Sequence, residues 1–362
     1  MKKALLYFFA FLFICFFLPA IFTDVGKPTN AKEAENLENQ EAKTKEEKLD
    51  NTKTQNPETE NVETQEKETQ DSNREDTEKY KDINIKLLHS KTGEIEEVKI
   101  ENYLCHVVSA EMPADYQIEA LKPQAIVATT YTMYKIKNKK HENADICDNS
   151  ECCQAWVSKE ERLARWEESK RESNWQKIEQ SINETKGKII TYQNEPINAF
   201  FHANSGGKTE IPVNVWGGTG LPYLQVVETA GEEGSTQYAS EVELTHEEII
   251  NKLKEKYPDI QIDFSKEEEI QIKEHTDGQR VKTIKFGNHE LSGVETRTIF
   301  GLKSAKFEII KSEGKIKFTV KGYGHGVGMS QTGADALAKQ GKTAEEIIHH
   351  FYRNIEIKNI KS

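Results

Sequence analysis

The chain has 362 residues, 36% of them hydrophobic and 30% charged, and its formal net charge is −12 at pH 7. This length is enough for one large domain or two ordinary ones. The negative charge argues against a nucleic acid partner, because a phosphate backbone attracts basic surfaces.

Residues 1–23 predict a membrane segment. Lys2 and Lys3 precede an uncharged, apolar run from residue 4 to residue 22, and about 20 apolar residues cross a bilayer. Lysines on this side favour a cytoplasmic N-terminus. A cleaved signal peptide is the alternative, but the run is long for one and no clear small-x-small cleavage site follows it. We therefore expect an uncleaved, single-pass signal anchor, with the bulk of the protein outside the cytoplasm.

Residues 24–80 predict a disordered acidic tether. Between residues 31 and 80 there are 16 acidic and 8 basic side chains, so this part carries −8 of the net charge. Such a segment buries too little apolar surface to offset the loss of chain entropy. We favour a spacer from the membrane over an interaction tail, which leaves residues 81–362 as the folded domain.

The folded domain should begin with a β-hairpin and two helices. Residues 82–100 alternate in hydrophobicity and turn at residues 91–93, as a hairpin does. Residues 101–135 then show apolar residues at helical spacing in two segments. Pro123 is tolerated only in the first turn of a helix, so we expect the second helix to begin near Leu121.

Glu111 is the candidate general acid. Apolar residues from Leu104 to Val108 predict one buried face of the first helix. That helix should end at Met112, because Pro113 disfavours the helical conformation of the residue before it. Glu111 then lies on the last turn in apolar surroundings, where burial raises the pKa of a carboxyl into the range of a general acid. The alternative is an ordinary solvated carboxylate at a helix end.

The remaining pattern mixes helices and short strands without a regular strand-helix-strand rhythm, so we predict an α+β fold. The capping signals Ser158-x-x-Glu161, Thr245-x-x-Glu248 and Thr343-x-x-Glu346 each predict the start of a helix. The expected elements are a helix over 158–186, strands over 188–193, 197–202 and 224–228, a helix from 245, short strands within 258–290, a hairpin of 307–310 with 316–320, helices over 331–339 and from 343, and a last strand over 355–357.

A turn-rich loop over residues 141–153 is a candidate metal site. His141, Cys147 and Cys153 offer one imidazole and two thiolates, a set that suits zinc and leaves its fourth position open. Two neighbouring cysteines cannot easily both face one metal, so we expect Cys152 to be spare. A disulfide from Cys147 to Cys152 or Cys153 is the alternative, since an exported compartment permits disulfides. Cys105 should be a small buried hydrophobe.

Two glycine-rich loops are candidate ligand sites. Residues 322–331 lack the Lys-Ser/Thr of a phosphate loop, and we interpret them as a wall facing a sugar. Tyr323 would stack on a ring face, while His325, Ser330 and Gln331 would bond hydroxyls. The alternative is a glycine-rich packing turn. The second loop, residues 202–207, has glycines that let backbone approach a ligand.

Four separated motifs together resemble the stage II sporulation protein D family and the related amidase-enhancer proteins. The resemblance covers most of residues 85–357. The motifs are YLCHVVSAEMPADYQIEALKPQAIVATTYTMYK, FFHANSGGKTE, VWGGTGLPYLQVV and KGYGHGVGMSQTGADALAKQGKTAEEIIHHFY.

The resemblance implies a membrane-anchored lytic transglycosylase of the mother cell. We expect its mixed helices and short strands to form two lobes around a glycan-binding cleft. The enzyme would act during engulfment of the forespore, with a companion amidase/endopeptidase and a membrane scaffold protein. Its substrate would be glycan strands already stripped of stem peptides. The resemblance implies Glu111 as the acid, Lys122, Tyr323, His325 and Ser330 as substrate contacts, and His141, Cys147 and Cys153 as zinc ligands. From the two glycine-rich loops we also expect Ser205 and Gln331 to contact the substrate.

One carboxyl is enough for the implied reaction, because the muramyl C6 hydroxyl replaces water as the nucleophile. Lys122 should reach Glu111 only through the substrate, since a close ammonium would lower the pKa of the acid. Two rival functions remain open at this point. One is a glycan-binding activator of the companion amidase without catalysis of its own, and the other is a zinc hydrolase that uses the open metal position.

Overall fold

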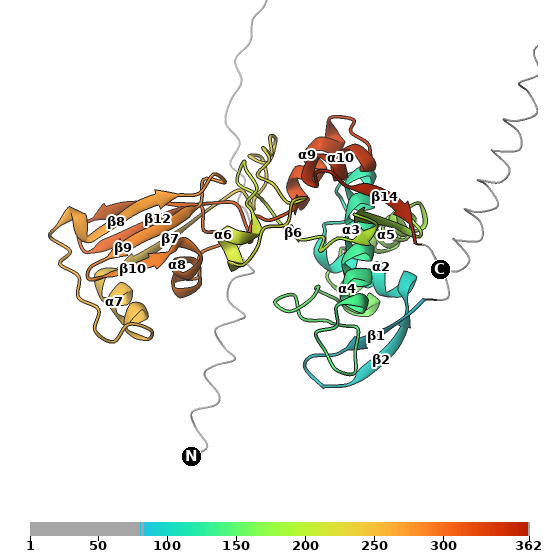
Figure 1. Cartoon of the computed structure of the whole chain (residues 1–362), viewed down its shortest axis with the longest axis horizontal. Helices are drawn as coiled ribbons and strands as arrows, with labels where there is room; N and C mark the ends of the chain where they lie inside the picture. The colour runs from blue at the N-terminus through green and yellow to red at the C-terminus, as the bar shows by residue number, and fades with distance from the viewer. Residues whose placement is uncertain (1–79, 81–82, 361–362) are drawn as a thin grey trace, which may run out of the picture. The chain divides into compact units, whose positions relative to one another are not determined.

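The computed structural model describes residue 80 and residues 83–360 (Figure 1). The expected anchor, 1–23, and all of the expected tether except Tyr80 lie outside these residues. Within the described part of the chain, no helix is both long enough and apolar enough to cross a bilayer. Helices and several small sheets are interspersed along it, which confirms the mixed composition predicted from the sequence.

The described helices vary from one turn to more than five turns. They are α2 Ile100–Glu111, α3 Ile118–Lys137, α4 Lys159–Ala164, α5 Arg171–Asn183, α6 Pro212–Trp216, α7 His246–Lys254, α8 Gly293–Phe300, α9 Gln331–Lys339 and α10 Ala344–Phe351, with 3₁₀ turns η1 Glu168–Lys170 and η2 Glu267–Glu269.

The strands form small sheets rather than one continuous sheet. They are β1 Asn84–Leu88, β2 Ile95–Lys99, β3 Ile146–Cys147, β4 Lys188–Tyr192, β5 Glu195–Pro196, β6 Phe201–His202, β7 Ala239–Thr245, β8 Ile270–His275, β9 Val281–Phe286, β10 His289–Ser292, β11 Phe307–Ser312, β12 Lys315–Lys321, β13 Met329–Ser330 and β14 Glu356–Asn359. The strand orders are β2-β1-β3, β10-β9-β8, β11-β12-β7, β13-β6 and β14-β4-β5.

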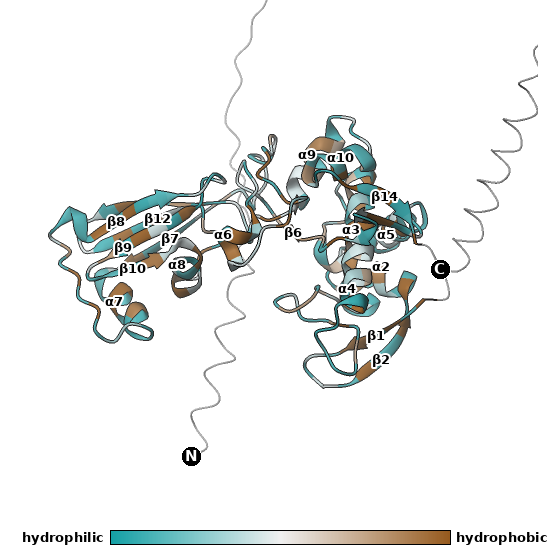
Figure 2. Ribbon diagram, in the orientation of Figure 1, coloured by the Kyte–Doolittle hydropathy of each residue, from teal (hydrophilic) through white to brown (hydrophobic). Residues whose placement is uncertain are grey.

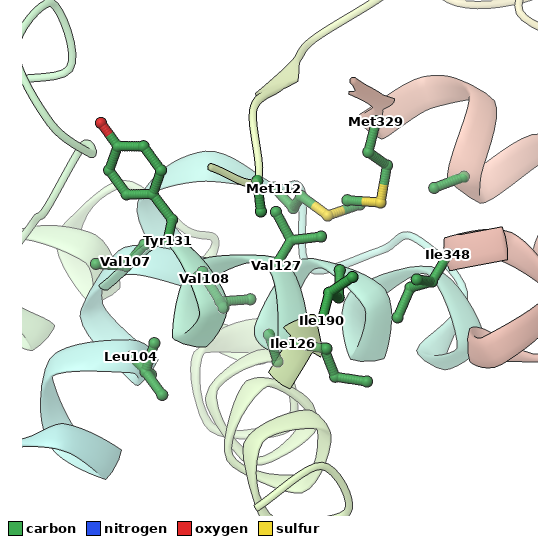
Figure 3. Close-up of a cluster of buried hydrophobic side chains, with 14 of the residues drawn as sticks. Leu104, Val107, Val108, Met112, Ile126, Val127, Tyr131, Ile190, Met329 and Ile348 are labelled. Carbon is green, nitrogen blue, oxygen red and sulfur yellow. The ribbon is translucent and has the colours of Figure 1, made fainter. Parts of the chain in front are cut away.

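The larger of two hydrophobic cores surrounds α3. Helices α2, α5, α9 and α10 pack on it, and residues from both ends of the described chain contribute to this core. Met112 and Met329 point toward one another in Figure 3, so the end of α2 is packed against the strand that precedes α9. Burying one such side chain contributes roughly 1.5–3 kcal/mol.

The second core is built by β7–β12 with α7 and α8. Ile316, Phe318 and Val320 of β12 are all buried while the residues between them are more exposed, as expected for a sheet with one face on a core. Hydrophobic residues accordingly recur between hydrophilic ones along β8, β9 and β12 (Figure 2). The side chain of Thr245 caps α7 and Glu248 completes the capping box.

The structure confirms several predictions that rest on local sequence signals. The first hairpin pairs residues 84–88 with 95–99, and the hairpin of β11 and β12 pairs Phe307 with Val320. Thr245 and Thr343 both sit in complete capping boxes. Ser158 caps α4 by accepting a bond from the Glu161 N–H.

Four predictions about elements were wrong. Helix α3 begins at Ile118 rather than near Leu121, and Pro123 is buried inside it; packing of its surroundings outweighs the hydrogen bond that Pro123 cannot donate. The expected helix over 158–186 is broken into α4, η1 and α5. Residues 224–228 form no strand, although Glu228 makes an isolated bridge to Lys208. Residues 197–202 are strand only at β6, which pairs with β13.

The glycine loop of residues 322–328 is packed against the segment 200–206. Gly322, Gly324, Gly326 and Gly328 all have φ between 74° and 109°. A Cβ on Gly324 would lie 2.9 Å from Cβ of His202, and one on Gly328 would overlap the Phe200 carbonyl oxygen. Close backbone packing therefore requires these glycines, which favours the packing-turn interpretation for most of the loop.

Replacing Gly328 by alanine should destabilise the protein far more than the same change at Gly341. Both residues have positive φ, but a Cβ on Gly341 meets nothing within 4 Å. We expect Gly328→Ala to lower the free energy of unfolding by about 3 kcal/mol or more, and Gly341→Ala by about 1 kcal/mol from backbone strain alone. Urea denaturation followed by circular dichroism measures both. Equal losses would show that steric packing of the loop is not the constraint.

Candidate active site around Glu111

Glu111 is the last residue of α2, as predicted. Met112 after it is extended, with φ −119° and ψ 143°, because Pro113 follows. The backbone N–H of Ala155 donates to Glu111 Oε1 at 2.9 Å, and the side chain of Gln331 is a second hydrogen-bonding neighbour of the carboxylate. The site thus joins α2, a loop after the cysteine cluster and the first residue of α9.

The surroundings raise the pKa of Glu111 from 4.5 to about 7. Burial is the main cause, because it penalises the charged form, and the bonds from Ala155 and Gln331 oppose it by stabilising the carboxylate. Both donors are neutral, so no cation pulls the pKa back down. Near neutral pH the carboxyl is therefore divided between its protonated and ionised forms, which is the condition for a group that must give and then take a proton.

Gln331 is placed by contacts on two sides. It is 5% exposed, and its Nε2 donates to Oε1 of Gln124 on α3 at 3.4 Å. The sequence predicted Gln331 as a sugar ligand, whereas the structure places it beside Glu111. Gln124 was not predicted, because only the three-dimensional packing of α3 against α9 brings it there.

Lys122 forms ion pairs with residues other than Glu111. Its ammonium pairs with Glu119 Oε1 at 2.5 Å and with Glu184 Oε2 at 2.6 Å. Residues two apart on a helix point in directions about 200° apart, so Lys122 leaves α3 on a different side from Gln124. The structure does not bring Lys122 to the hydrogen-bond partners of Glu111, and its contact with substrate stays a prediction.

Ser205 and Ser330 are fully buried and share one internal partner, Glu232. The Ser205 N–H donates to Glu232 Oε1 at 3.0 Å, and the Ser330 hydroxyl donates to the same oxygen. The other oxygen accepts from the Gly207 N–H at 2.9 Å and the Thr229 hydroxyl at 2.7 Å. These serines therefore fix the two glycine-rich loops to each other, and their contact with a sugar stays a prediction. No local signal marks Glu232 among its acidic neighbours.

The imidazole of His325 is neutral and partly buried. The Val327 N–H donates to its Nδ1 at 3.0 Å, which leaves the proton on Nε2. Burial, with Arg297 and Arg280 nearby, lowers the pKa of His325 to about 3. Since Nδ1 already accepts a bond and the ring does not take up a proton near pH 7, His325 is poorly suited to act as a base.

Two aromatic side chains face solvent near the glycine loop. Tyr323 is 38% exposed, with the ammonium of Lys303 4.3 Å from its ring centroid. Trp216 is 51% exposed, and its ring centroid lies 4.6 Å from that of Phe200 and 5.0 Å from that of His325. The sequence predicted Tyr323 as a stacking residue. Trp216 was missed, although its place in the motif VWGGTGLPYLQVV was a usable signal.

The predicted metal loop brings together four side chains that could hold a metal ion, rather than three. One ligand atom from each of His141, Cys147, Cys152 and Cys153 lies within 4.8 Å of the others. The Sγ atoms of Cys152 and Cys153 are each 3.6 Å from His141 Nε2 and 3.8 Å from one another. A tetrahedral zinc with ordinary bond lengths has N–S edges of about 3.6 Å and S–S edges of about 3.8 Å. The donor set therefore fits zinc.

Cys152, which was expected to be spare, lies in the cluster beside Cys153. The chain turns at residues 149–153, where the N–H groups of Cys152 and Cys153 both bond the Asn149 carbonyl. This turn directs both thiols to the same side. All the cysteines in the described part of the chain are free thiols, so the structure does not contain the alternative disulfide.

The loop that follows the cysteine cluster is held by side-chain contacts on both sides of Ala155, the residue that donates to Glu111. Gln154 Nε2 donates to the Tyr103 hydroxyl at 3.3 Å and to Thr132 Oγ1 at 3.1 Å. The ring of Trp156 stacks on His106 with centroids 4.8 Å apart. Ala155, which donates to Glu111, lies between these two anchors and only two residues after Cys153.

Comparison with known proteins shows the family to which the chain belongs. A family model described as stage II sporulation protein matches residues 88–192. Stage II sporulation protein D of Bacillus subtilis (strain 168) is 34% identical over 284 residues, which are 78% of this chain and 80% of that protein. The Bacillus amyloliquefaciens protein of the same name is 32% identical, covering 79% and 82%. The chain belongs to the stage II sporulation protein D family.

The amidase enhancer of Bacillus subtilis (strain 168) is also similar, with 27% identity over 68% of this chain and 39% of that protein. Membership in the stage II sporulation protein D family confirms the resemblance found in the four motifs and gives the chain a role in sporulation. The matched region from 88 to 192 contains Glu111, Lys122 and the whole cysteine cluster.

The raised pKa of Glu111 should appear in the pH dependence of stability. The folded state keeps the proton to about pH 7 whereas the unfolded chain loses it near 4.5, so the stabilisation is complete below pH 4.5 and is lost as pH rises through 7. Between pH 5 and pH 8 the unmodified protein should lose about 2 kcal/mol more than Glu111→Gln. Chemical denaturation at both pH values measures this. Glu313→Gln, at an exposed turn, is the control, and a variant difference independent of pH would contradict the assignment.

Proposed function

We propose that this protein is a membrane-anchored lytic transglycosylase acting on peptidoglycan strands whose stem peptides have been removed. It would cleave between N-acetylmuramic acid and N-acetylglucosamine and leave 1,6-anhydro-muramyl ends, during engulfment of the forespore. The observation that carries the proposal is the carboxyl of Glu111, held by two neutral donors with a pKa of about 7. The companion amidase/endopeptidase and the scaffold protein would be its partners at the mother-cell membrane.

One carboxyl supplies both proton transfers. Protonated Glu111 gives its proton to the glycosidic oxygen as the bond from that oxygen to C1 of the muramyl sugar breaks. The resulting carboxylate takes the proton of the C6 hydroxyl, and O6 forms the new bond to C1. No water enters and the protein ends as it began. A pKa near 7 suits both steps, because the group is neither too weak an acid nor too weak a base.

A hollow lined by residues close in sequence to Glu111 and Gln331 would admit the glycan. It has a volume of about 410 Å³, and its lining includes Pro113, Tyr116, Thr332 and Asp335 with the turn of residues 231–237. Pro113 is two residues after Glu111 and Thr332 directly follows Gln331, so two lining residues are close in sequence to the site. Tyr116 provides an aromatic surface, and Asp335 also holds α3 by accepting from the Gln117 N–H at 2.8 Å.

We propose that His141, Cys147, Cys152 and Cys153 hold one zinc ion. When bound, zinc would cross-link the loop and supply no open position for substrate, because four protein ligands complete its tetrahedron. This donor set argues against the zinc hydrolase. The chain's own residues do the rest: the loop after Cys153 presents the Ala155 N–H to Glu111.

The second candidate is a glycan-binding activator of the companion amidase. The similarity to an amidase enhancer favours it. The exposed rings of Tyr323 and Trp216 would serve glycan binding in either function. Only the fate of the glycosidic bond separates the two candidates.

Glu111→Gln should abolish glycan cleavage while leaving glycan binding intact. The purified protein is mixed with strands stripped of peptide, and mass spectrometry reads the products. We expect anhydro-ended fragments whose rate falls as pH rises through about 7, the pKa of the acid, and none from Glu111→Gln. Fragments carrying an added water would point to hydrolysis, and binding without any cleavage to the activator.

Cys152→Ser should impair zinc binding as severely as Cys147→Ser. Both thiols belong to the tetrahedral set, and loss of one ligand should lower the affinity for zinc at least 10-fold, by analogy with the cost of losing even an outer-shell partner. Metal content by mass spectrometry and competition with a chelator measure it. Cys105→Ser, outside the cluster, should leave zinc binding unchanged. If Cys152→Ser binds a full equivalent of zinc with unchanged affinity, the site has only three protein ligands and Cys152 is not one of them.

A further inference from the structure

A second pocket lies among the glycine loop, β11 and β12. It has a volume of about 440 Å³. Its charged lining consists of three lysines, Lys208, Lys306 and Lys321, against one carboxylate, Glu308. Of the chain's net charge of −12, −8 lies in residues 31–80, and the rest of the chain is still net negative, so a cationic pocket is not a general property of it. It therefore calls for a specific anionic ligand.

Two of these lysines have no ion-pair partner among the described residues. Lys306 Nζ donates to the Gly206 carbonyl at 2.7 Å and to Gln279 Oε1 at 2.8 Å, both neutral acceptors, and one of its three donors stays free. Lys321 is exposed at the end of β12. Lys208 pairs with Glu228 at 3.5 Å, and Glu228 itself is 81% exposed.

The pocket also has a buried cation nearby. Arg280 is 3% exposed and donates to the carbonyls of Lys208 at 3.0 Å and Ser205 at 3.1 Å. Burial, followed by Arg280 and Lys321, lowers the pKa of Lys306 to about 8. An anion in the pocket would relieve this repulsion among like charges.

The neutral part of the lining suits a sugar. Tyr238 offers aromatic surface, Thr319 offers a hydroxyl, and Gly206 and Gly207 offer backbone without side chains. The same Gly207 is bonded to Glu232, which also holds Ser330 next to Gln331. The pocket is thus connected to the Glu111 site through a single buried carboxylate.

We propose that this pocket binds the lactyl carboxylate of a muramyl residue in a strand whose stem peptide has been removed. The inference rests on the proposed function and deepens it. While the peptide is attached, the lactyl carboxyl is an uncharged amide. Hydrolysis of that amide exposes one carboxylate for each disaccharide. A pocket with two unpaired ammonium groups therefore distinguishes a stripped strand from a substituted one by charge.

The test compares strands that differ only in this charge. Glu111→Gln in the full chain prevents cleavage, and binding is measured by fluorescence anisotropy with labelled strands. One sample has free lactyl carboxylates and the other has them converted to neutral amides. We expect the free strands to bind about tenfold more tightly at low salt, with the difference removed by high salt. Equal affinities would overturn the proposal.

Variants locate the effect. Lys321→Glu, at an exposed position, should remove most of the preference for free carboxylates, and Lys306→Met should reduce it. Lys317→Glu is the matched control, because Lys317 lies on the same strand, pairs with Glu241 at 2.7 Å and is outside the pocket lining. If Lys317→Glu has the same effect as Lys321→Glu, the preference comes from general charge and the pocket assignment fails.

Inorganic phosphate serves as a competing anion. If phosphate competes with the strands for the protein, while free and amidated strands bind equally well, the pocket proposal fails and the pocket is assigned to a phosphate group instead. The proposed function is scored separately, by cleavage with the unmodified protein. Carboxylate-dependent binding without cleavage would leave the pocket standing and overturn the transglycosylase. Cleavage by the unmodified protein, with equal binding of free and amidated strands, would support the transglycosylase and overturn the pocket proposal.

Discussion

The buried carboxylate of Glu232 is the constraint on which the site depends. It accepts bonds from three separate segments, through Ser205 and Gly207, Thr229, and Ser330. A buried charge is costly unless its hydrogen-bonding capacity is filled, and here four donors fill it. The bond from Ser330, which also caps α9 by accepting from the Gly333 N–H, sets where α9 begins. Gln331 follows directly, and so the position of a neighbour of Glu111 is determined by a carboxylate that has no part in the proposed chemistry.

The proposed role of Glu111 depends on the opposite arrangement from that of Glu232, because few hydrogen-bond donors face its carboxyl. Burial raises its pKa, and only Ala155 and Gln331 oppose this. The nearest lysine in sequence after it, Lys122, is drawn into ion pairs with Glu119 and Glu184. That pairing keeps an ammonium from lowering the pKa of the acid. The two glutamates of the site thus differ in role because they differ in the number of donors that face them.

Features that depend on neighbours in sequence could be predicted, and features that depend on distant segments could not. Pro113 ends α2 locally, so the placement of Glu111 followed from sequence alone. The capping boxes at Thr245 and Thr343 are equally local. The pairing of Gln331 with Glu111 joins residues 220 positions apart, and the sharing of Glu232 by two serines is again a long-range result. Pro123 shows the same limit, since tertiary packing overrode a local preference.

The cysteine cluster shows how a local rule can mislead. The side chains of adjacent residues usually point apart, and for this reason Cys152 was not expected to be a metal ligand. The turn at Asn149 reverses that expectation, because both following N–H groups bond one carbonyl and the thiols converge. In the proposed zinc site, four protein ligands would complete the tetrahedron, so the metal would hold the loop and would offer no open position for catalysis. The loop it holds carries the donor that Glu111 requires, so the metal would act on the acid through the backbone of Ala155 rather than through its own charge.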